Sequence, residues 1–275
     1  MKKQLALAAL GAALCISAPA QAEPRDADFC MPCGVTEISL EGITDKEPVW
    51  GALLLRPIAE SDDHTCNTYF QTSIERTDGR TTFDAGIGRR RLVADNKVLL
   101  GANLFVDHEL PEDHERLSVG AEIRTSVLEV NTNYYRALTG WKDVSDTVEE
   151  QAMDGFDVEA GVPLPYLPAT QVRYKHSIWN GIDDVSDVHG NTVSLAAAIL
   201  PGMEVEAGYT GYNNQPSERF MKVTYMFGGT KLREQKTPRV SDKAYSFDSM
   251  EDRRFEKVRR ENRSFVAETE EPLIL

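Results

Sequence analysis

The densest group of side chains able to bind a metal or transfer protons is DHELPEDHE, from Asp107 to Glu115. It gathers two histidines and five carboxylates, residue types that zinc sites use. The stretch lacks the i, i+4 spacing of a helical HExxH site, and Pro111 interrupts it. We therefore expect a solvated or weakly cation-binding surface loop, and we predict neither a metal site nor a cofactor.

A hydrolytic triad could draw on Ser118, His176 or Ser194. Nothing in the chain resembles a nucleophile elbow, and no spacing favours a particular pair of serine and histidine. We therefore predict no catalytic residue and no enzymatic activity.

Thiol chemistry is a third candidate, because CMPC spans Cys30 to Cys33 and Cys66 follows. A thioredoxin-type site opens a helix after a strand. Here the motif is followed by GVTEISLEG, which has the pattern of a strand. We expect a disulfide within the trio Cys30, Cys33 and Cys66, with one thiol left over.

The first residues indicate an exported protein. Lys2 and Lys3, the apolar run LALAALGAALCISA and the Ala20-Gln21-Ala22 cleavage site supply the three regions of a secretory signal peptide, which we assign to residues 1–22. Beyond it, no run approaches the roughly 18 apolar residues of a spanning helix. The formal charge of -14 argues against nucleic acid as a partner.

From Val98 onward, apolar residues alternate with charged residues and glycines. In Glu115 to Arg124, one face carries Leu117, Val119, Ala121 and Ile123. Segments of about ten such residues are typical of a transmembrane β-barrel. A soluble β-sandwich also alternates, but it seldom fills its other face with glycines. Nor do its connections sort by length, as they do here into short ones (Thr125-Ser126, Pro163–Pro168, Leu200–Met203) and longer polar ones (His108–His114, Ala137–Asp154, Trp179–Gly190).

Ten segments between Thr68 and Phe227 fit this pattern, and Val35–Ile43 and Trp50–Pro57 are weaker candidates. We predict an all-β fold, an antiparallel transmembrane β-barrel of about 12 strands over residues 35–229. A short segment, 23–34, precedes it. An even number of strands brings both ends of the barrel to the periplasmic side.

The two faces of the alternating strands predict two different surfaces of the barrel. We expect an aromatic girdle at the membrane interface from Tyr134, Tyr135, Trp141, Tyr209, Tyr225 and Phe227. We expect the lumen to be lined by Arg116, Glu122, Arg124, Glu129, Asp157, Glu159 and Lys222. Their mixed signs favour pairs that brace the wall over a selectivity filter.

The residues after the barrel, 230–275, form a charged tail. DSMEDRRFEKVRRENRSF, Asp248 to Phe265, favours a helix that Asp248 or Ser249 could cap. From Lys231 to Arg263, eleven Lys and Arg stand against seven Asp and Glu, so the tail is basic below an acidic barrel. It could be held against the barrel or within it.

Several motifs resemble the inverse autotransporters, the intimin and invasin family: GANLFVDHELPEDHERLSVGAEIR, NYYRALTGWKD, GFDVEAGVPLPYLPATQVRYKHS and VTYMFG, followed by RRFEKVRRENRSFV. The resemblance covers about Thr68 to Phe265. It implies a twelve-stranded barrel in the outer membrane of a Gram-negative bacterium. In that family a linker threads back through the pore and carries an adhesive passenger.

The chain ends at Leu275, so we expect a translocator and anchor without its own passenger. The alternative is a small passive outer-membrane channel, or a structural barrel whose loops bind. Expected partners are outer-membrane lipid, a surface ligand of the extracellular loops, and the barrel-assembly machinery. The alternation of Val223, Tyr225 and Phe227 resembles the C-terminal signal that this machinery recognises.

Overall fold

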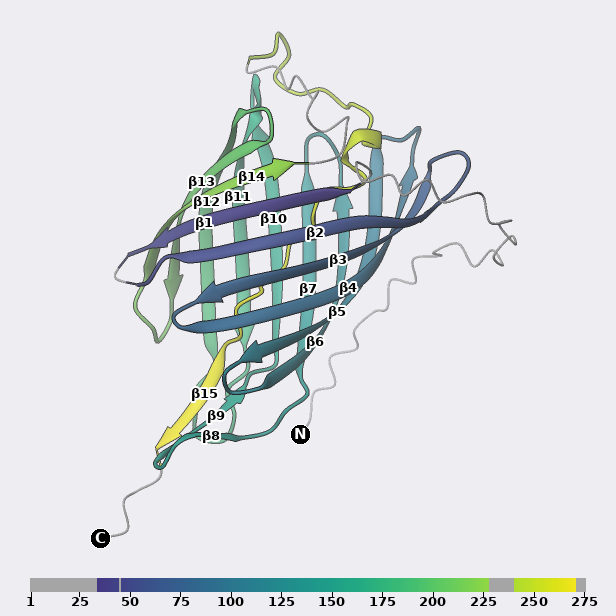
Figure 1. The fold of residues 1–275 in the computed structure, drawn as a ribbon. Helices are drawn as coiled ribbons and strands as arrows, with labels where there is room; N and C mark the ends of the chain where they lie inside the picture. Colours follow the sequence, from purple (N-terminus) through teal and green to yellow (C-terminus); the bar gives the residue numbers. More distant parts are fainter. Residues whose placement is uncertain (1–33, 45, 228–239, 271–275) are drawn as a thin grey trace, which may run out of the picture. The chain divides into compact units, whose positions relative to one another are not determined.

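The computed structural model describes residues 34–44, 46–227 and 240–270. The predicted signal peptide, Cys30 and Cys33 lie outside them. Twelve antiparallel strands close into a barrel in the order β1-β14-β13-β12-β11-β10-β7-β6-β5-β4-β3-β2, as Figure 1 shows. The barrel strands are β1 Val35–Ile43, β2 Val49–Glu60, β3 Cys66–Thr77, β4 Arg80–Val93, β5 Val98–Leu110, β6 His114–Arg124, β7 Glu129–Ala137, β10 Gly155–Leu164, β11 Leu167–Trp179, β12 Val188–Leu200, β13 Met203–Tyr212 and β14 Glu218–Phe227.

This architecture confirms the predicted antiparallel barrel and its strand number. In the described residues no helix is long and apolar enough to cross a membrane. The two weaker strand candidates near the N-terminus both form, and β1 pairs with β14 to close the barrel.

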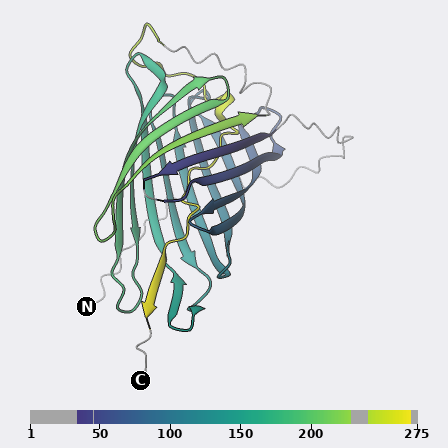
Figure 2. The ribbon, with the colours of Figure 1, turned by 60° about the vertical axis from the view of Figure 1, so that its left-hand side comes forward.

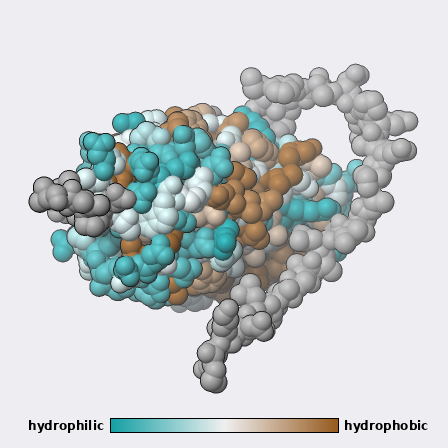
Figure 3. Space-filling model, turned by 90° about the horizontal axis from the view of Figure 1, so that it is seen from below, coloured by the Kyte–Doolittle hydropathy of each residue, from teal (hydrophilic) through white to brown (hydrophobic). Residues whose placement is uncertain are grey.

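The barrel has its apolar side chains outside and its charges inside. In β6, Val119 and Ile123 are 52% and 47% exposed, whereas Glu122 between them is 3% exposed. This inverted pattern is what a strand needs when lipid is the outer solvent. Figure 3 shows brown apolar side chains gathered beside teal hydrophilic ones on the surface.

One predicted loop is wrong. β5 runs to Leu110 and β6 begins at His114, so only residues 111–113 remain of the loop expected over His108–His114. Charged residues mark loops only when they face water, and here Asp107, Glu109 and His114 point into the lumen and are at most 2% exposed. The alternation of this stretch therefore reflects a strand hairpin.

The longest connection, 138–154, contains a hairpin of its own. Its strands β8, Lys142–Ser145, and β9, Val148–Ala152, stand beyond the end of β7 and β10. A third strand, β15, Val266–Glu270, pairs with β9 in the order β15-β9-β8. This three-stranded sheet lies at the end of the barrel opposite to the short connections 94–97, 125–128 and 165–166 (Figure 1).

The helix predicted for Asp248–Phe265 is wrong. Only one 3-10 turn, η1, Glu251–Arg253, forms, and the chain then runs extended to β15. Figures 1 and 2 show this yellow segment passing down inside the barrel from the short-turn end to the β8-β9 hairpin.

Candidate functional site: the threaded lumen

The tail, residues 240–270, is fixed at both ends of the barrel. At the short-turn end, the Met250 N–H donates to the Asn96 carbonyl at 2.7 Å, and the Ser126 hydroxyl donates to the Ser246 carbonyl at 2.6 Å. At the opposite end, the Met153 N–H donates to the Phe265 carbonyl at 2.8 Å. Residues 251–265 therefore cross the lumen from one end to the other.

Three wall arginines, Arg90, Arg116 and Arg124, bind the backbone of the crossing segment. We call them the arginine row. Arg90 Nη1 donates to the carbonyls of Arg254 at 2.7 Å and Glu256 at 2.6 Å. Arg124 Nη2 donates to the Lys257 carbonyl at 2.9 Å. Arg116 donates through Nη2 to the Glu261 carbonyl at 2.8 Å and through Nη1 to the Arg263 carbonyl at 3.2 Å.

These hydrogen bonds explain why the tail is extended. A chain inside a barrel must satisfy its buried carbonyls, and an α-helix does so through its own N–H groups. Here the wall supplies the donors, with Asn133 donating to the Arg259 carbonyl at 3.0 Å. The wall also accepts, because the Val258 N–H donates to Gln71 Oε1 and the Glu261 N–H to the Tyr135 hydroxyl. The helix is therefore unnecessary, whatever the propensity of its residues.

The arginine row is held in place by buried carboxylates and aromatic rings. Glu122 receives Arg90 Nε at 2.5 Å and pairs with Arg124 at 2.6 Å. Asp107 pairs with Arg116 at 2.8 Å. The three guanidinium groups and these two carboxylates are at most 3% exposed. Arg90 and Arg116 also lie 4.5 Å from the ring centroids of Tyr69 and Tyr135, a geometry that stabilises a cation.

The side chains of the tail form a second set of contacts. Arg260 Nη2 lies 2.6 Å from Asp107 and 3.0 Å from the Ser118 hydroxyl. Each of the remaining charged tail residues from 253 to 263 forms an ion pair with a residue of the barrel wall. These pairs are Arg253–Glu129, Arg254–Glu60, Glu256–Arg124, Lys257–Glu37, Arg259–Glu159, Glu261–Lys175 and Arg263–Glu218.

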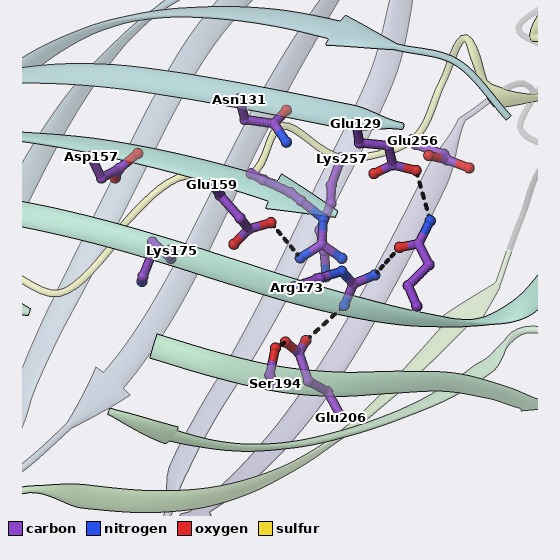
Figure 4. A network of polar contacts seen from close by, with 12 residues as sticks. Glu129, Asn131, Asp157, Glu159, Arg173, Lys175, Ser194, Glu206, Glu256 and Lys257 are labelled. Atoms are coloured by element: carbon purple, nitrogen blue, oxygen red, sulfur yellow. Dashed lines mark hydrogen bonds and ion pairs between the residues drawn. The ribbon is translucent and has the colours of Figure 1, made fainter. Parts of the chain in front are cut away.

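Figure 4 shows the part of this network on β7, β10, β11, β12 and β13, with Glu256 and Lys257 of the tail. Arg173 from β11 lies 3.0 Å from Glu206, and Gln171 donates to Glu129 at 3.0 Å. Within the described residues, the hydrogen bonds of Arg173 go to the wall side chains Glu204, Glu206 and Gln171, so it braces the barrel instead of binding the tail backbone.

An aromatic cluster lies at the end of the lumen near the β8-β9 hairpin. The Phe265 ring stacks on Trp179 with centroids 4.5 Å apart and an interplanar angle of 14°. Tyr135 lies 5.1 Å from Trp179, and Met153 from the long loop is buried against them. Trp141 packs against the same cluster.

The structure shows where each of the predicted lumen residues lies. Arg116, Glu122, Arg124, Glu129 and Asp157 face the lumen and are at most 3% exposed. The other two predicted lumen residues, Glu159 and Lys222, pair with Arg259 at 3.3 Å and with Glu41 at 3.3 Å.

Of the predicted girdle, Tyr134, Tyr209 and Tyr225 lie on the outer face and are 44–47% exposed. Phe227 is partly buried and lies 6.0 Å from Tyr225, ring to ring. Tyr135 is not a girdle residue, because it is fully buried and its hydroxyl donates to Asp157 at 2.6 Å. Adjacent residues of a strand point to opposite faces, so Tyr134 and Tyr135 cannot both face lipid.

The residues that were weighed as members of a catalytic triad do not lie together in one site. Ser118 and Ser194 face the lumen, where they bind Arg260 and Glu206, whereas His176 binds Asn191 on the outer face. Within residues 34–44, 46–227 and 240–270, no group of three or more His, Cys, Asp or Glu is arranged to hold a metal ion. Cys66 lies at the start of β3, and a disulfide within the trio Cys30, Cys33 and Cys66 stays a prediction.

Sequence reasoning missed Arg90, Asp107 as a lumen residue, and Tyr69. The signal was present for Arg90, because it shares a face with the small residues Gly86 and Gly88 in the alternating run of β4. It was hidden by the neighbouring Arg89 and Arg91, which make the three arginines look like one solvated patch.

The fold and the threaded lumen define a class: an outer-membrane β-barrel that holds a polypeptide segment across its pore. The family model for the inverse autotransporter beta-domain matches residues 51–262. The chain belongs to this family, and the Gram-negative outer membrane is its location.

Two relatives of this chain are proteins of Escherichia coli K12. The chain is 36% identical over 110 residues to a putative attaching and effacing protein homolog, covering 39% of this chain and 37% of that protein. It is 29% identical over 153 residues to the inverse autotransporter adhesin YeeJ, covering 53% of this chain and 6% of YeeJ. The chain thus spans well under two thirds of the length of these relatives.

Solved structures support the fold alone. A chain from the work "Unveiling the Mechanism Behind the in-meso Crystallization of Membrane Proteins" has a TM-score of 0.72 at 18% identity, covering 86% of this chain and 99% of that one. The COG4313 outer membrane channel from Pseudomonas putida F1 has a TM-score of 0.52 at 10% identity, covering 74% of this chain and 100% of that channel.

Proposed function

We propose that this barrel anchors a polypeptide in the outer membrane and passes it to the cell surface, with the tail as the part of that polypeptide held in the pore. The observation that carries the proposal is the path of the tail. It enters at the short-turn end, crosses the lumen and pairs as β15 with the hairpin of the longest loop. Long loops mark the outer side of such barrels, so the path runs from periplasm to surface.

Anchoring follows from the outer face. Apolar side chains such as Leu104, Val119 and Val193 are 44–54% exposed around the barrel, which suits contact with lipid. The ion pairs along residues 253–263 hold the tail inside, because the buried wall carboxylates Glu37 and Glu129 would lose Lys257 and Arg253 if the tail left the lumen.

Protease accessibility on intact cells tests the direction of the path. One epitope tag is placed after Leu275, a second between Asp183 and Asp184 in the connection after β11, and a third between Asp62 and Asp63 in the short connection after β2. We expect protease to remove the first two tags and to spare the third. The third tag must become cleavable when the outer membrane is permeabilised.

The pattern of protection separates the alternatives. If the tag after Leu275 stays protected while the loop tag is lost, the tail does not reach the surface and the translocator proposal is contradicted. If only the third tag is cleaved on intact cells, the assumed orientation is contradicted.

We also propose two partners. The end of β14, with Val223, Tyr225 and Phe227 alternating, is the candidate signal for the barrel-assembly machinery, and Phe227→Ser should lower the amount of folded barrel in the outer membrane. The sheet β15-β9-β8 and the connection 180–187 form the candidate surface for an extracellular ligand.

A further inference from the structure

The contacts between wall and tail divide into two kinds that differ in what they require of the tail. The carbonyl oxygens that accept wall hydrogen bonds belong to Arg254, Glu256, Lys257, Arg259, Glu261, Asn262 and Arg263. A carbonyl is present at every residue of any polypeptide, so these hydrogen bonds do not depend on sequence. The ion pairs of the same segment do depend on it.

We propose that the arginine row, Arg90, Arg116 and Arg124, is a binding track for the backbone of an extended polypeptide of any sequence. This inference rests on the proposed translocator function and adds how the wall recognises a passing chain: by its carbonyl groups. The resident tail is the segment that stays on the track because its side chains also pair with the wall.

The chemistry of arginine suits such a track. A guanidinium has five N–H donors in a rigid fork, so it can hold a wall carboxylate with some of them and a carbonyl with the others. Arg90 does this, because Nε and Nη2 face Glu122 while Nη1 faces the tail. A lysine offers one nitrogen for both tasks.

The wall side chains that hydrogen-bond to the backbone of residues 254–263 lie on one side of the barrel, on β3, β4, β6 and β7. On another side of the tail lies a polar cavity of about 230 Å³, lined among others by Ser39, Glu75 and Thr210. Several tail side chains, including Lys257 and Arg259, border it. This arrangement binds the backbone on one side and leaves space for differing side chains on the other.

The test uses the full chain with an epitope tag after Leu275, and measures how fast the tag becomes protease-accessible on intact cells. Each rate is divided by the amount of folded barrel, measured as the band that shifts on heating in gel electrophoresis. The first variant places the side chains of residues 254–263 in a different order, which keeps composition and net charge but breaks the specific ion pairs. It changes no wall residue.

The second variant is Arg90→Lys with Arg124→Lys, which keeps both charges beside Glu122. Its matched control is Arg173→Lys, because Arg173 is a buried wall arginine whose hydrogen bonds go to the wall side chains Gln171, Glu204 and Glu206. We expect the reordered tail and Arg173→Lys to stay within about two-fold of the unmodified chain. We expect the double lysine variant to slow exposure by about ten-fold with either tail, because one ammonium cannot replace the fork.

Two results would contradict the proposal that the arginine row is a binding track. One is a reordered tail that slows exposure as much as the double lysine variant, since ion pairs would then carry the binding. The other is a double lysine variant that behaves like Arg173→Lys. If the double variant yields no folded barrel, the reordered tail alone decides. A protected tag on the unmodified chain would contradict the translocator function instead, so the two failures are distinguishable.

Discussion

Removing the Phe265 ring should release the tail from the outer end of the barrel without unfolding the barrel. Phe265 is 8% exposed, stacks on the fully buried Trp179 and carries the Arg263 guanidinium 4.7 Å from its ring centroid. It directly precedes β15, whose residue Ala267 pairs with Gln151 of β9. The ring therefore fixes the point at which the tail leaves the lumen.

The magnitude follows from burial. Truncating a buried Phe to Ala costs about 3–5 kcal/mol, including the cavity that remains. We take about 3 kcal/mol for Phe265→Ala, because a cluster at the open end of a barrel can partly collapse into the space. At about 1.4 kcal/mol for each factor of ten, opening of β15 from β9 should become about 150-fold more frequent.

Amide hydrogen exchange on the purified protein in detergent measures this opening strand by strand. The amides that pair β15 with β9 should exchange about two orders of magnitude faster in Phe265→Ala, as a local opening does. The amides of β5 and β6 should keep their rates. Phe247→Ala is the matched control, because Phe247 lies on the same tail but is 56% exposed.

The reasoning would be refuted by unchanged exchange in β15 and β9, since the stack would then contribute nothing to holding the tail. Equal acceleration in every strand would also refute it, because Phe265 would then support the whole barrel.

Deleting residues 230–275 should open the pore, so that the shortened barrel conducts ions in planar bilayers while the intact chain stays nearly silent; equal conductance would favour the passive channel. Asp107→Asn should lower the free energy of unfolding by about 3 kcal/mol, read from urea titration in lipid, because it leaves two buried guanidinium groups beside a neutral amide. In Gly155→Ala a Cβ would overlap the Trp179 indole, so tryptophan emission should shift, whereas Gly140→Ala meets nothing within 4 Å and should not change it.

Much of the barrel could be predicted because its signal is local. A strand between lipid and a polar lumen must alternate, and the alternation of β6 and β10 can be recognised without knowing their neighbours. The same rule would have separated Tyr134 from Tyr135, since adjacent residues of β7 cannot face the same side. The His108–His114 loop was misjudged because charge was taken as a sign of water, whereas in a barrel it also marks the lumen.

The sequence by itself determined the export signal pattern, the alternating strands, the barrel and the basic character of the tail, because each depends on residues close together in the chain. The tertiary structure decided the conformation and the place of the tail. Residues 254–263 have helix-favouring side chains, but helix propensity is worth less than about 1 kcal/mol per residue. Wall donors such as Arg90 and Arg116, more than a hundred positions away, satisfy the tail's carbonyls and so replace the hydrogen bonds of a helix. Only the closed barrel brings those donors to the tail.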